Sequence, residues 1–498
     1  MSAESEATEA LRRGGLAKAG WDLDSALAFY QAAIGNSRAT GDTQLEAKAW
    51  QELASVHRRA GRWSEALRAL DCAVALFRSR DDTDNGLELQ RSIGRVQVEL
   101  GDWVAARDVF ESLLSSPQRQ ADSAARAATL SDLGNVLGEQ GEWTLAIRTL
   151  TEALRIHRAS MDRAGEAQTL RRLGSVYCDQ GRWREALTAL SESQHLLQEI
   201  GDKHGTARTL RGLGQALLQG DAWQDAIDAY EKSLEILKAL GDTHGHARSL
   251  RGLGNVYAEM GYWGPALDAL DQSLKVLHEM GDRRGEARSL LSIATVMRSQ
   301  GNIGEGQDAL RRALAVFEDV SDERGRAKAA SSLAITHAEN LEYDSAIPLL
   351  RACVEIFERL GDRRRVGQML SNLGSVYGRA GRWVEAIETL KESLMILQEG
   401  GSSRSVGMVL NNIGSVYLAR SLGLQAADYF LQDLEICRSL GDLRGEGLSL
   451  SNLGLALAEQ GSWEEASRLL EESLEIFQRL SDPRAQATLW ASLGSVYA

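Results

Sequence analysis

The sequence predicts an all-α solenoid, a single array of about twelve stacked helix-turn-helix units. Three observations lead to this prediction. Residues of the same type recur every 40 positions, apolar residues follow helical stripes within each unit, and glycines fall at fixed places while only 4 prolines occur in 498 residues. A constant period of this size is typical of an array in which each unit is one supersecondary element.

The period is clearest for tryptophan and aspartate. Aspartates recur every 40 residues from Asp42 to Asp482, and only Ser402 breaks their series. The tryptophans are Trp63, Trp103, Trp143, Trp183, Trp223 and Trp263, followed by Trp383 and Trp463. We interpret the tryptophans as packing residues of the core or between units. Since the register continues without insertion, we expect one domain, residues 1–498: an irregular first repeat at 1–46, eleven regular repeats at 47–486 and a terminal capping helix at 487–498.

The unit at residues 246–286 shows why each element is expected. Its first helix carries an apolar face at Leu250, Leu253, Gly254 and Tyr257, spaced i, i+3, i+4, i+7. Gly261 ends that helix, and Pro265 is tolerated in the first turn of the next one. The second helix has its own stripe at Ala266, Leu267, Leu270, Leu274 and Leu277. Gly281 suits the left-handed position after this helix, and Asp282 suits the N-cap of the following one.

Charge and composition argue against several classes of partner. The net charge is -14, which disfavours bulk binding to nucleic acid or to an anionic membrane surface. No run approaches the roughly 18 apolar residues of a membrane-spanning helix, and the first residues lack the apolar core of a signal peptide. The 4 cysteines lie far apart without metal-ligand spacing, so we expect free thiols in a reducing compartment. We therefore expect a cytoplasmic protein with neither nucleic-acid nor membrane partners.

Motifs that carry catalysis or bind cofactors are absent from the sequence. No phosphate-binding GxxxxGK[ST], HExxH or GxSxG occurs. The closest histidine cluster, His204, His244 and His246, has no cysteine or carboxylate at ligand spacing, and we interpret it as part of surface turns. We expect no catalytic residues, no metal and no cofactor, and hence a protein that is not an enzyme.

The repeated pattern resembles the tetratricopeptide repeat (TPR). The residues that carry this resemblance, in one unit, are Leu253, Gly254, Tyr257, Gly261, Trp263, Ala266, Leu270 and Ser273. The family usually has a period of 34 residues. The longer form is similar to the repeats of Pins/LGN-type adaptors and of the TPR arms of bacterial regulators. This sequence departs from the family by having Trp where Tyr is usual and, in many units, Ser where Ala is usual.

The resemblance implies a right-handed superhelix in which the first helix of each unit lines a concave groove. It also implies a non-catalytic protein that binds extended peptides or partner helices there. On this orientation, the stripe of the first helix beside its core face should point into the groove. Stacking at 40-residue spacing then turns each groove position into a ladder of side chains.

Two zones of candidate ligand-binding residues follow from these ladders. The middle units carry a basic zone, with one asparagine: Arg171, Arg172, Arg208, Arg211, Arg248, Arg251, Asn255, Arg288 and Lys328. The later units carry asparagines: Asn372, Asn411, Asn412 and Asn452. Guanidinium groups suit carboxylates or phosphates, and an amide can both donate to and accept from a peptide backbone. The zones together predict a protein or peptide partner with an acidic segment.

Other interpretations of the same residues stay open. Each arginine could instead pair with Glu or Asp of its own or an adjacent unit, which would make the ladder a lattice of solvated salt bridges. A regulatory receptor for a peptide or small ligand, acting on an effector in trans, is an alternative to the interaction scaffold. Self-association through the terminal repeats is a further expectation, since the ends of a solenoid expose apolar surface.

Overall fold

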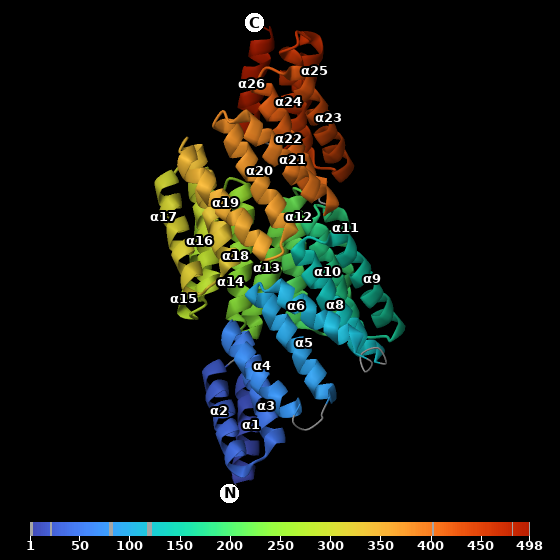
Figure 1. Cartoon of the computed structure of the whole chain (residues 1–498), viewed down its shortest axis with the longest axis vertical. Coiled ribbons are helices and arrows are strands. Elements are labelled where there is room, and N and C mark those ends of the chain that lie inside the picture. The colour runs from blue at the N-terminus through green and yellow to red at the C-terminus, as the bar shows by residue number, and fades with distance from the viewer. Residues whose placement is uncertain are drawn as a thin grey trace. The chain divides into compact units, whose positions relative to one another are not determined.

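The computed structural model describes residues 3–19, 22–78, 83–116, 122–400, 403–480 and 482–497 (Figure 1). The described residues form 25 helices and no strand. This confirms the predicted all-α solenoid. Among the described helices, none combines the length and the apolar composition that crossing a bilayer requires.

The helices form twelve pairs, followed by one further helix. The first helices of the pairs, and the final helix, are α1 (Ala3–Ala19), α3 (Thr43–Arg59), α5 (Thr83–Leu100), α8 (Ser123–Gln140), α10 (Arg163–Asp179), α12 (Lys203–Gln219), α14 (Thr243–Glu259), α16 (Arg283–Ser299), α18 (Glu323–Glu339), α20 (Arg363–Arg379), α22 (Ser403–Leu418), α24 (Leu443–Ala458) and α26 (Pro483–Tyr497). The second helices are α2 (Leu23–Thr40), α4 (Trp63–Arg78), α6 (Trp103–Ser115), α9 (Trp143–Ala159), α11 (Trp183–Glu199), α13 (Trp223–Leu240), α15 (Trp263–Glu279), α17 (Ile303–Asp319), α19 (Tyr343–Arg359), α21 (Trp383–Glu399), α23 (Gly423–Leu440) and α25 (Trp463–Arg479). The final helix begins four residues before the expected position 487.

Each first helix begins at the predicted capping signal. Gly281 has φ +69°, a left-handed conformation that ends the preceding helix without a side-chain penalty. Asp282 then caps α16 by accepting a hydrogen bond from the backbone N–H of Gly285 at 2.9 Å. The same aspartate cap precedes α12 and α14. The repeated Gly-Asp pair therefore sets both the end of one unit and the start of the next.

Packing between the two helices of a unit depends on small residues in the first helix. A Cβ on Gly254 would lie 2.8 Å from Cγ of Leu270, so the glycine lets α14 and α15 approach closely. The core at this place contains Ala266, Leu270, Ile293 and Val296, contributed by α15 and α16. Each second helix thus packs between the first helix of its own unit and that of the next.

The serines that depart from the family pattern join the two helices of a unit. Ser273 on α15 donates its hydroxyl to the backbone carbonyl of Ala247 on α14, at 2.8 Å. Serines at the same place in other units do the same, and the thiol of Cys353 replaces them in one unit: Ser193, Ser233, Ser393 and Ser473. Because these side chains are buried, the carbonyl that accepts the bond satisfies a hydroxyl that would otherwise be costly to bury.

The chain divides into two compact units. Unit 1 consists of Met1–Gln140, Leu145–Val176 and Glu185–Arg326, and unit 2 consists of Gly141–Thr144, Tyr177–Arg184 and Ala327–Ala498. Apart from Lys328, the basic zone of the sequence lies in unit 1. Lys328 and the asparagine zone lie in unit 2.

Candidate anion-binding site

Six arginines of unit 1 occupy two repeated positions on consecutive first helices. One position holds Arg171, Arg211 and Arg251 on α10, α12 and α14. The other holds Arg208, Arg248 and Arg288 on α12, α14 and α16. We call these six residues the arginine cluster. Within the part of the chain that the structure describes, none of the six has a hydrogen bond or an ion pair.

The electrostatics of the arginine cluster show that its members lie close together. Burial and the nearby guanidiniums of Arg172, Arg208 and Arg248 lower the pKa of Arg171 to about 9. Burial, Arg248 and Arg288 likewise lower the pKa of Arg251 to about 9. The pKa of Arg211 is lowered too, by burial and then by Arg248 and Arg208. Each guanidinium therefore carries a charge that burial and its neighbours disfavour, and a bound anion would relieve both costs.

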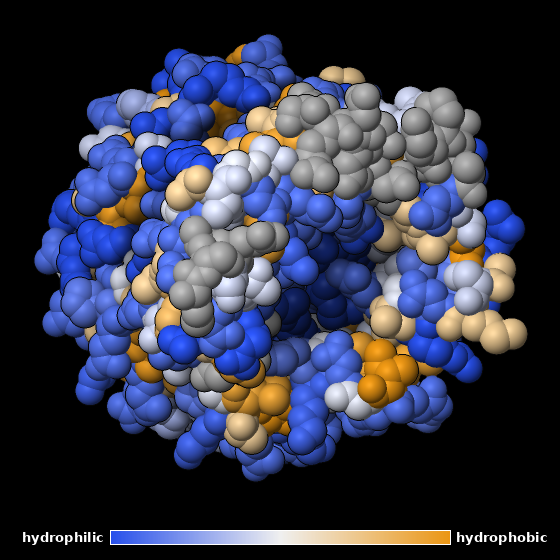
Figure 2. All heavy atoms as spheres, turned by 90° about the horizontal axis from the view of Figure 1, so that it is seen from below, coloured by the Kyte–Doolittle hydropathy of each residue, from blue (hydrophilic) through white to orange (hydrophobic). Residues whose placement is uncertain are grey.

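Residues from early helices complete the surroundings of the cluster. Burial and the charge of Arg95 lower the pKa of Arg58 to about 10, and Arg208 contributes to this lowering. Arg95 on α5 also acts on Arg171, and Glu99 on α5 partly offsets the lowered pKa of Arg248. Since these residues are far apart in sequence, the repeats of unit 1 curve around the cluster. Seen from the end where the N-terminus lies, the molecule has a central hollow whose visible residues are hydrophilic (Figure 2).

Arg172 differs from the cluster because its guanidinium is already bound. It is buried at 7% exposure, forms an ion pair with Asp132 and donates to Oγ of Ser131 at 2.7 Å. Asp132, itself 4% exposed, also lies 3.1 Å from Nε of Arg91. The side chain of Arg172 therefore links α10 to α8, and the sequence pattern gave no sign of this buried partner.

The asparagines of unit 2 likewise have partners within the protein. Asn412 donates to Oγ of Ser371 at 3.1 Å, and Asn452 donates to Oδ1 of Asn411 at 3.2 Å. Asn411 donates in turn to Oδ2 of Asp433 on α23, at 3.0 Å. Arg172, Asn412 and Asn452 occupy the same position in their units, and each bonds a residue 41 positions earlier. This position serves as a link between neighbouring units.

The remaining predicted residues have varied surroundings. Asn255 is exposed on α14, within the same helix as two members of the arginine cluster. Lys328 on α18 and Asn372 on α20 are half-buried. The structure thus brings the six arginines together in unit 1. The asparagines of unit 2 form short chains of hydrogen bonds instead.

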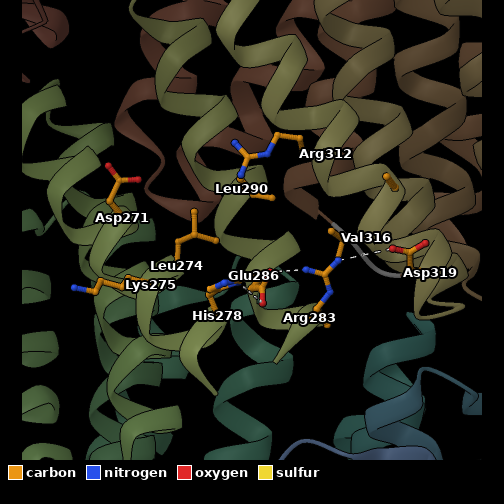
Figure 3. A pocket seen from close by; sticks show the side chains of 11 residues that line it. Asp271, Leu274, Lys275, His278, Arg283, Glu286, Leu290, Arg312, Val316 and Asp319 are labelled. Atoms are coloured by element: carbon orange, nitrogen blue, oxygen red, sulfur yellow. Dashed lines mark hydrogen bonds and ion pairs between the residues drawn. The ribbon is translucent and has the colours of Figure 1, made fainter. Parts of the chain in front are cut away.

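A cleft on α15, α16 and α17 has a different character. It encloses about 600 Å³ and is lined by both acidic and basic side chains (Figure 3). Arg283 lies 3.0 Å from Glu286 and 3.8 Å from Asp319, and Nδ1 of His278 lies 3.3 Å from Glu286. Because these charges already balance one another, the cleft lacks the excess positive charge of the arginine cluster.

No group of three or more His, Cys, Asp or Glu side chains in the described ranges is arranged to hold a metal ion. The histidines of the predicted surface turns contact aspartates that cap the next unit. Nε2 of His244 lies 3.0 Å from Asp282, and Nδ1 of His204 lies 3.5 Å from Asp242. These histidines therefore join neighbouring turns.

Comparison with known families identifies the class of this solenoid. The model of the tetratricopeptide repeat matches residues 45–119, 87–159, 165–239, 218–279, 325–399, 405–479 and 445–498. These matches cover most of the sequence, so the chain belongs to the tetratricopeptide repeat family. No curated protein matches the whole sequence at the significance that we required.

Solved structures of similar fold have low sequence identity to this chain. A Rap protein complexed with competence and sporulation factor has 16% identity and a TM-score of 0.46, with 75% of this chain and 98% of that chain covered. The Cut9–Hcn1 hetero-tetramer of APC/C has 17% identity and a TM-score of 0.44, with 99% of this chain and 90% of that one covered. BtubC from P. vanneervenii has 18% identity and a TM-score of 0.39, with 44% and 92% covered.

Proposed function

We propose that this protein is a non-catalytic interaction scaffold whose arginine cluster binds an extended acidic segment of a partner protein. The observation that carries the proposal is the absence of partners within the described chain for six neighbouring guanidiniums. Burial and mutual repulsion lower the pKa of Arg171, Arg211, Arg248 and Arg251. A row of carboxylates supplies the missing negative charge and accepts paired hydrogen bonds from the planar guanidiniums.

The repeat geometry supports an extended ligand with regularly placed charges. Helices α12, α14 and α16 pack in succession, and each brings its arginines to the same position. Packed helices lie roughly 8–10 Å apart, and an extended chain advances about 3.3 Å per residue. Each step between arginines therefore spans about three residues of ligand, so acidic residues at every third position fit the cluster best.

Charge also favours capture of an acidic partner by this part of the surface. The whole chain carries a net charge of -14, so the cluster is a positive site on an acidic protein. Such a site attracts a negatively charged segment and increases the association rate at low ionic strength. Binding should accordingly weaken as salt is added.

The proposal is tested with synthetic peptides and a fourfold charge reversal. A fluorescent peptide with glutamate at every third position is titrated against the wild-type chain and against the variant R208E/R211E/R248E/R251E. We expect binding that falls roughly hundredfold or more in the variant, because each reversed residue adds repulsion as well as losing a bidentate pair. Circular dichroism verifies that the variant is folded.

A matched control separates local from overall charge. The variant R12E/R68E/R311E/R468E changes the net charge equally at arginines whose side chains are 54% exposed or more. It should bind the peptide within about threefold of wild type, since exposed charges are screened by salt. Equal loss in both variants, or full binding after reversal of the cluster, would show that the cluster is not the ligand site.

A further inference from the structure

Arg324 connects two parts of unit 1 that are distant in sequence. Its guanidinium carbon lies 3.6 Å from the centre of the Trp103 ring, at the start of α6. Its Nη1 lies 3.2 Å from Oε2 of Glu139, at the end of α8. Trp103 is 1% exposed, so this ring is covered on all sides. The contact joins helices about five and a half repeats apart, which means that the repeats of unit 1 complete a turn here.

The same contact occurs within unit 2 with other residues. Arg364 at the start of α20 lies 5.9 Å from the centre of the Trp143 ring and 3.9 Å from Oδ1 of Asp179. Trp143 is also 1% exposed, whereas Trp463, at the same position of a later repeat, is 53% exposed. A Cβ on Gly141 would lie 2.6 Å from Cβ of Arg364, so the two backbones approach closely. The contact is therefore a repeated feature of the fold.

The sequence carries this contact as two series that are in phase. Arginine occupies the position of Arg324 in every repeat from residue 284 onward, while the earlier repeats have histidine or alanine at 124, 164, 204 and 244. The arginines are Arg284, Arg324, Arg364, Arg404, Arg444 and Arg484. Each has a tryptophan 221 residues before it, in the unbroken series Trp63, Trp103, Trp143, Trp183, Trp223 and Trp263. Arginine thus appears where an earlier tryptophan is available to meet it.

The turn that Arg324 closes contains the arginine cluster. Arg58 and Arg208 influence one another although they belong to α3 and α12, and Glu99 on α5 acts on Arg248 on α14. Early and later helices of unit 1 therefore face each other around the cluster. A segment bound there would contact both sides, and its charge would reduce the repulsion between them.

We propose that Arg324 is a clasp that holds a turn of unit 1 closed around the arginine cluster, and that opening of the clasp admits and releases the ligand. The gating part rests on the proposed function, whereas the clasp itself does not. A stacked guanidinium with one ion pair is a contact of moderate strength, which opens often enough to permit exchange of a ligand. By reciprocity, a ligand that binds the closed turn more tightly also favours closure.

The clasp is tested first without ligand. Hydrogen–deuterium exchange of the full chain compares R324A with R326A, a variant on the same helix that removes a more exposed arginine with a weak 3.8 Å ion pair. We expect exchange at the start of α6 to become about tenfold faster in R324A and to stay within about twofold in R326A. Unchanged exchange in R324A overturns the clasp. The variant R324K, which keeps the charge, should show an intermediate rate, and it decides the matter if R324A does not fold.

Gating is tested with the acidic peptide of the preceding section. Stopped-flow measurements should show dissociation about tenfold faster from R324A than from R326A, although neither residue belongs to the cluster. Faster exchange at α6 with unchanged dissociation overturns gating and leaves the clasp as a structural contact. If the wild-type chain does not bind the peptide at all, the proposed function and gating both fail, and the exchange experiment still decides the clasp.

Discussion

The arginine cluster of unit 1 and the asparagine zone of unit 2 occupy equivalent positions of the repeat but differ in what their polar groups do. Arg211 and Asn411 stand at the same position, 200 residues apart. Asn411 donates to Asp433 and accepts from Asn452, whereas Arg211 has no partner among the described residues. Equivalent places in the two units thus hold a completed network and an uncompensated charge.

This difference shows what separates a structural polar residue from a candidate ligand-binding one. Both zones follow from the same 40-residue ladders in the sequence, so periodicity alone treats them equally. The buried carboxylate of Asp433 is the partner that unit 2 supplies and that the cluster lacks. Polar groups with internal partners stabilise the fold, while polar groups without them destabilise it until a ligand binds. Four variants test this contrast, starting with the largest expected effect.

Removal of Arg172 should destabilise unit 1 strongly, because this arginine behaves like the asparagines. R172L leaves the buried carboxylate of Asp132 without its main partner, although Arg91 remains 3.1 Å away. We expect a loss of about 3 kcal/mol in local opening free energy, measured by hydrogen exchange of α8 and α10. The double variant D132N/R172L should recover part of this loss, since it also removes the charge. A loss below about 1 kcal/mol would contradict the structural role.

Removal of Asn411 should destabilise unit 2 by a smaller amount. N411L deletes one donor to Asp433, which is 5% exposed and keeps the hydroxyl of Ser449 at 2.6 Å. The expected cost is about 2 kcal/mol, read from hydrogen exchange of α22 and α23. As a comparison, N255L changes an exposed asparagine and should cost less than about 0.5 kcal/mol. Equal effects of the two changes would remove the distinction between the zones.

Neutralising one member of the arginine cluster should have the opposite sign. R211Q removes a charge that burial and the repulsion of Arg248 and Arg208 disfavour. We expect unit 1 to gain about 0.5 kcal/mol, detected as slower exchange in α12, while affinity for the acidic peptide falls. Stability that decreases together with binding would indicate that Arg211 has a structural partner after all.

The smallest expected effect is a dependence of stability on alkaline pH. Arg171 and Arg251 have a pKa of about 9 in the folded protein, below the ordinary value of 12.5. Between these values the unfolded chain binds more protons than the folded one, so raising the pH above about 9 favours folding at these sites. Relative to R171Q/R251Q, the wild-type chain should gain about 0.3 kcal/mol between pH 8 and pH 10. A constant difference would show that these guanidiniums are not repelled.

The fold was accessible from the sequence because its signals are local and repeated. Gly281 and Asp282 end one helix and start the next as their conformational preferences predict, and the serine that departs from the family pattern bonds a carbonyl within its own unit. Each such signal needs only the residues of one unit or of its neighbour. The helix boundaries and the twelve pairs follow directly from them.

The site was only partly accessible because it depends on curvature. The ladders identified the six arginines, but the partner of Arg172 depends on side-chain direction across two units. Arg58 was missed, because its approach to Arg208 requires knowing how far the array bends in nearly four units. A signal for the bend was nevertheless present, since the arginines from Arg284 onward are in phase with the tryptophans from Trp63 onward.

The clasp has a consequence for how such a chain can change its length. Tryptophan and arginine recur with the same 40-residue period, so losing or duplicating one whole repeat moves every arginine to the place of the next. Each tryptophan then meets another arginine of the same kind, and the contact survives. Loss of half a repeat would instead place a second helix where a first helix is needed. The number of repeats is therefore free to vary in whole steps, and selection on copy number can act without redesigning the contact between turns.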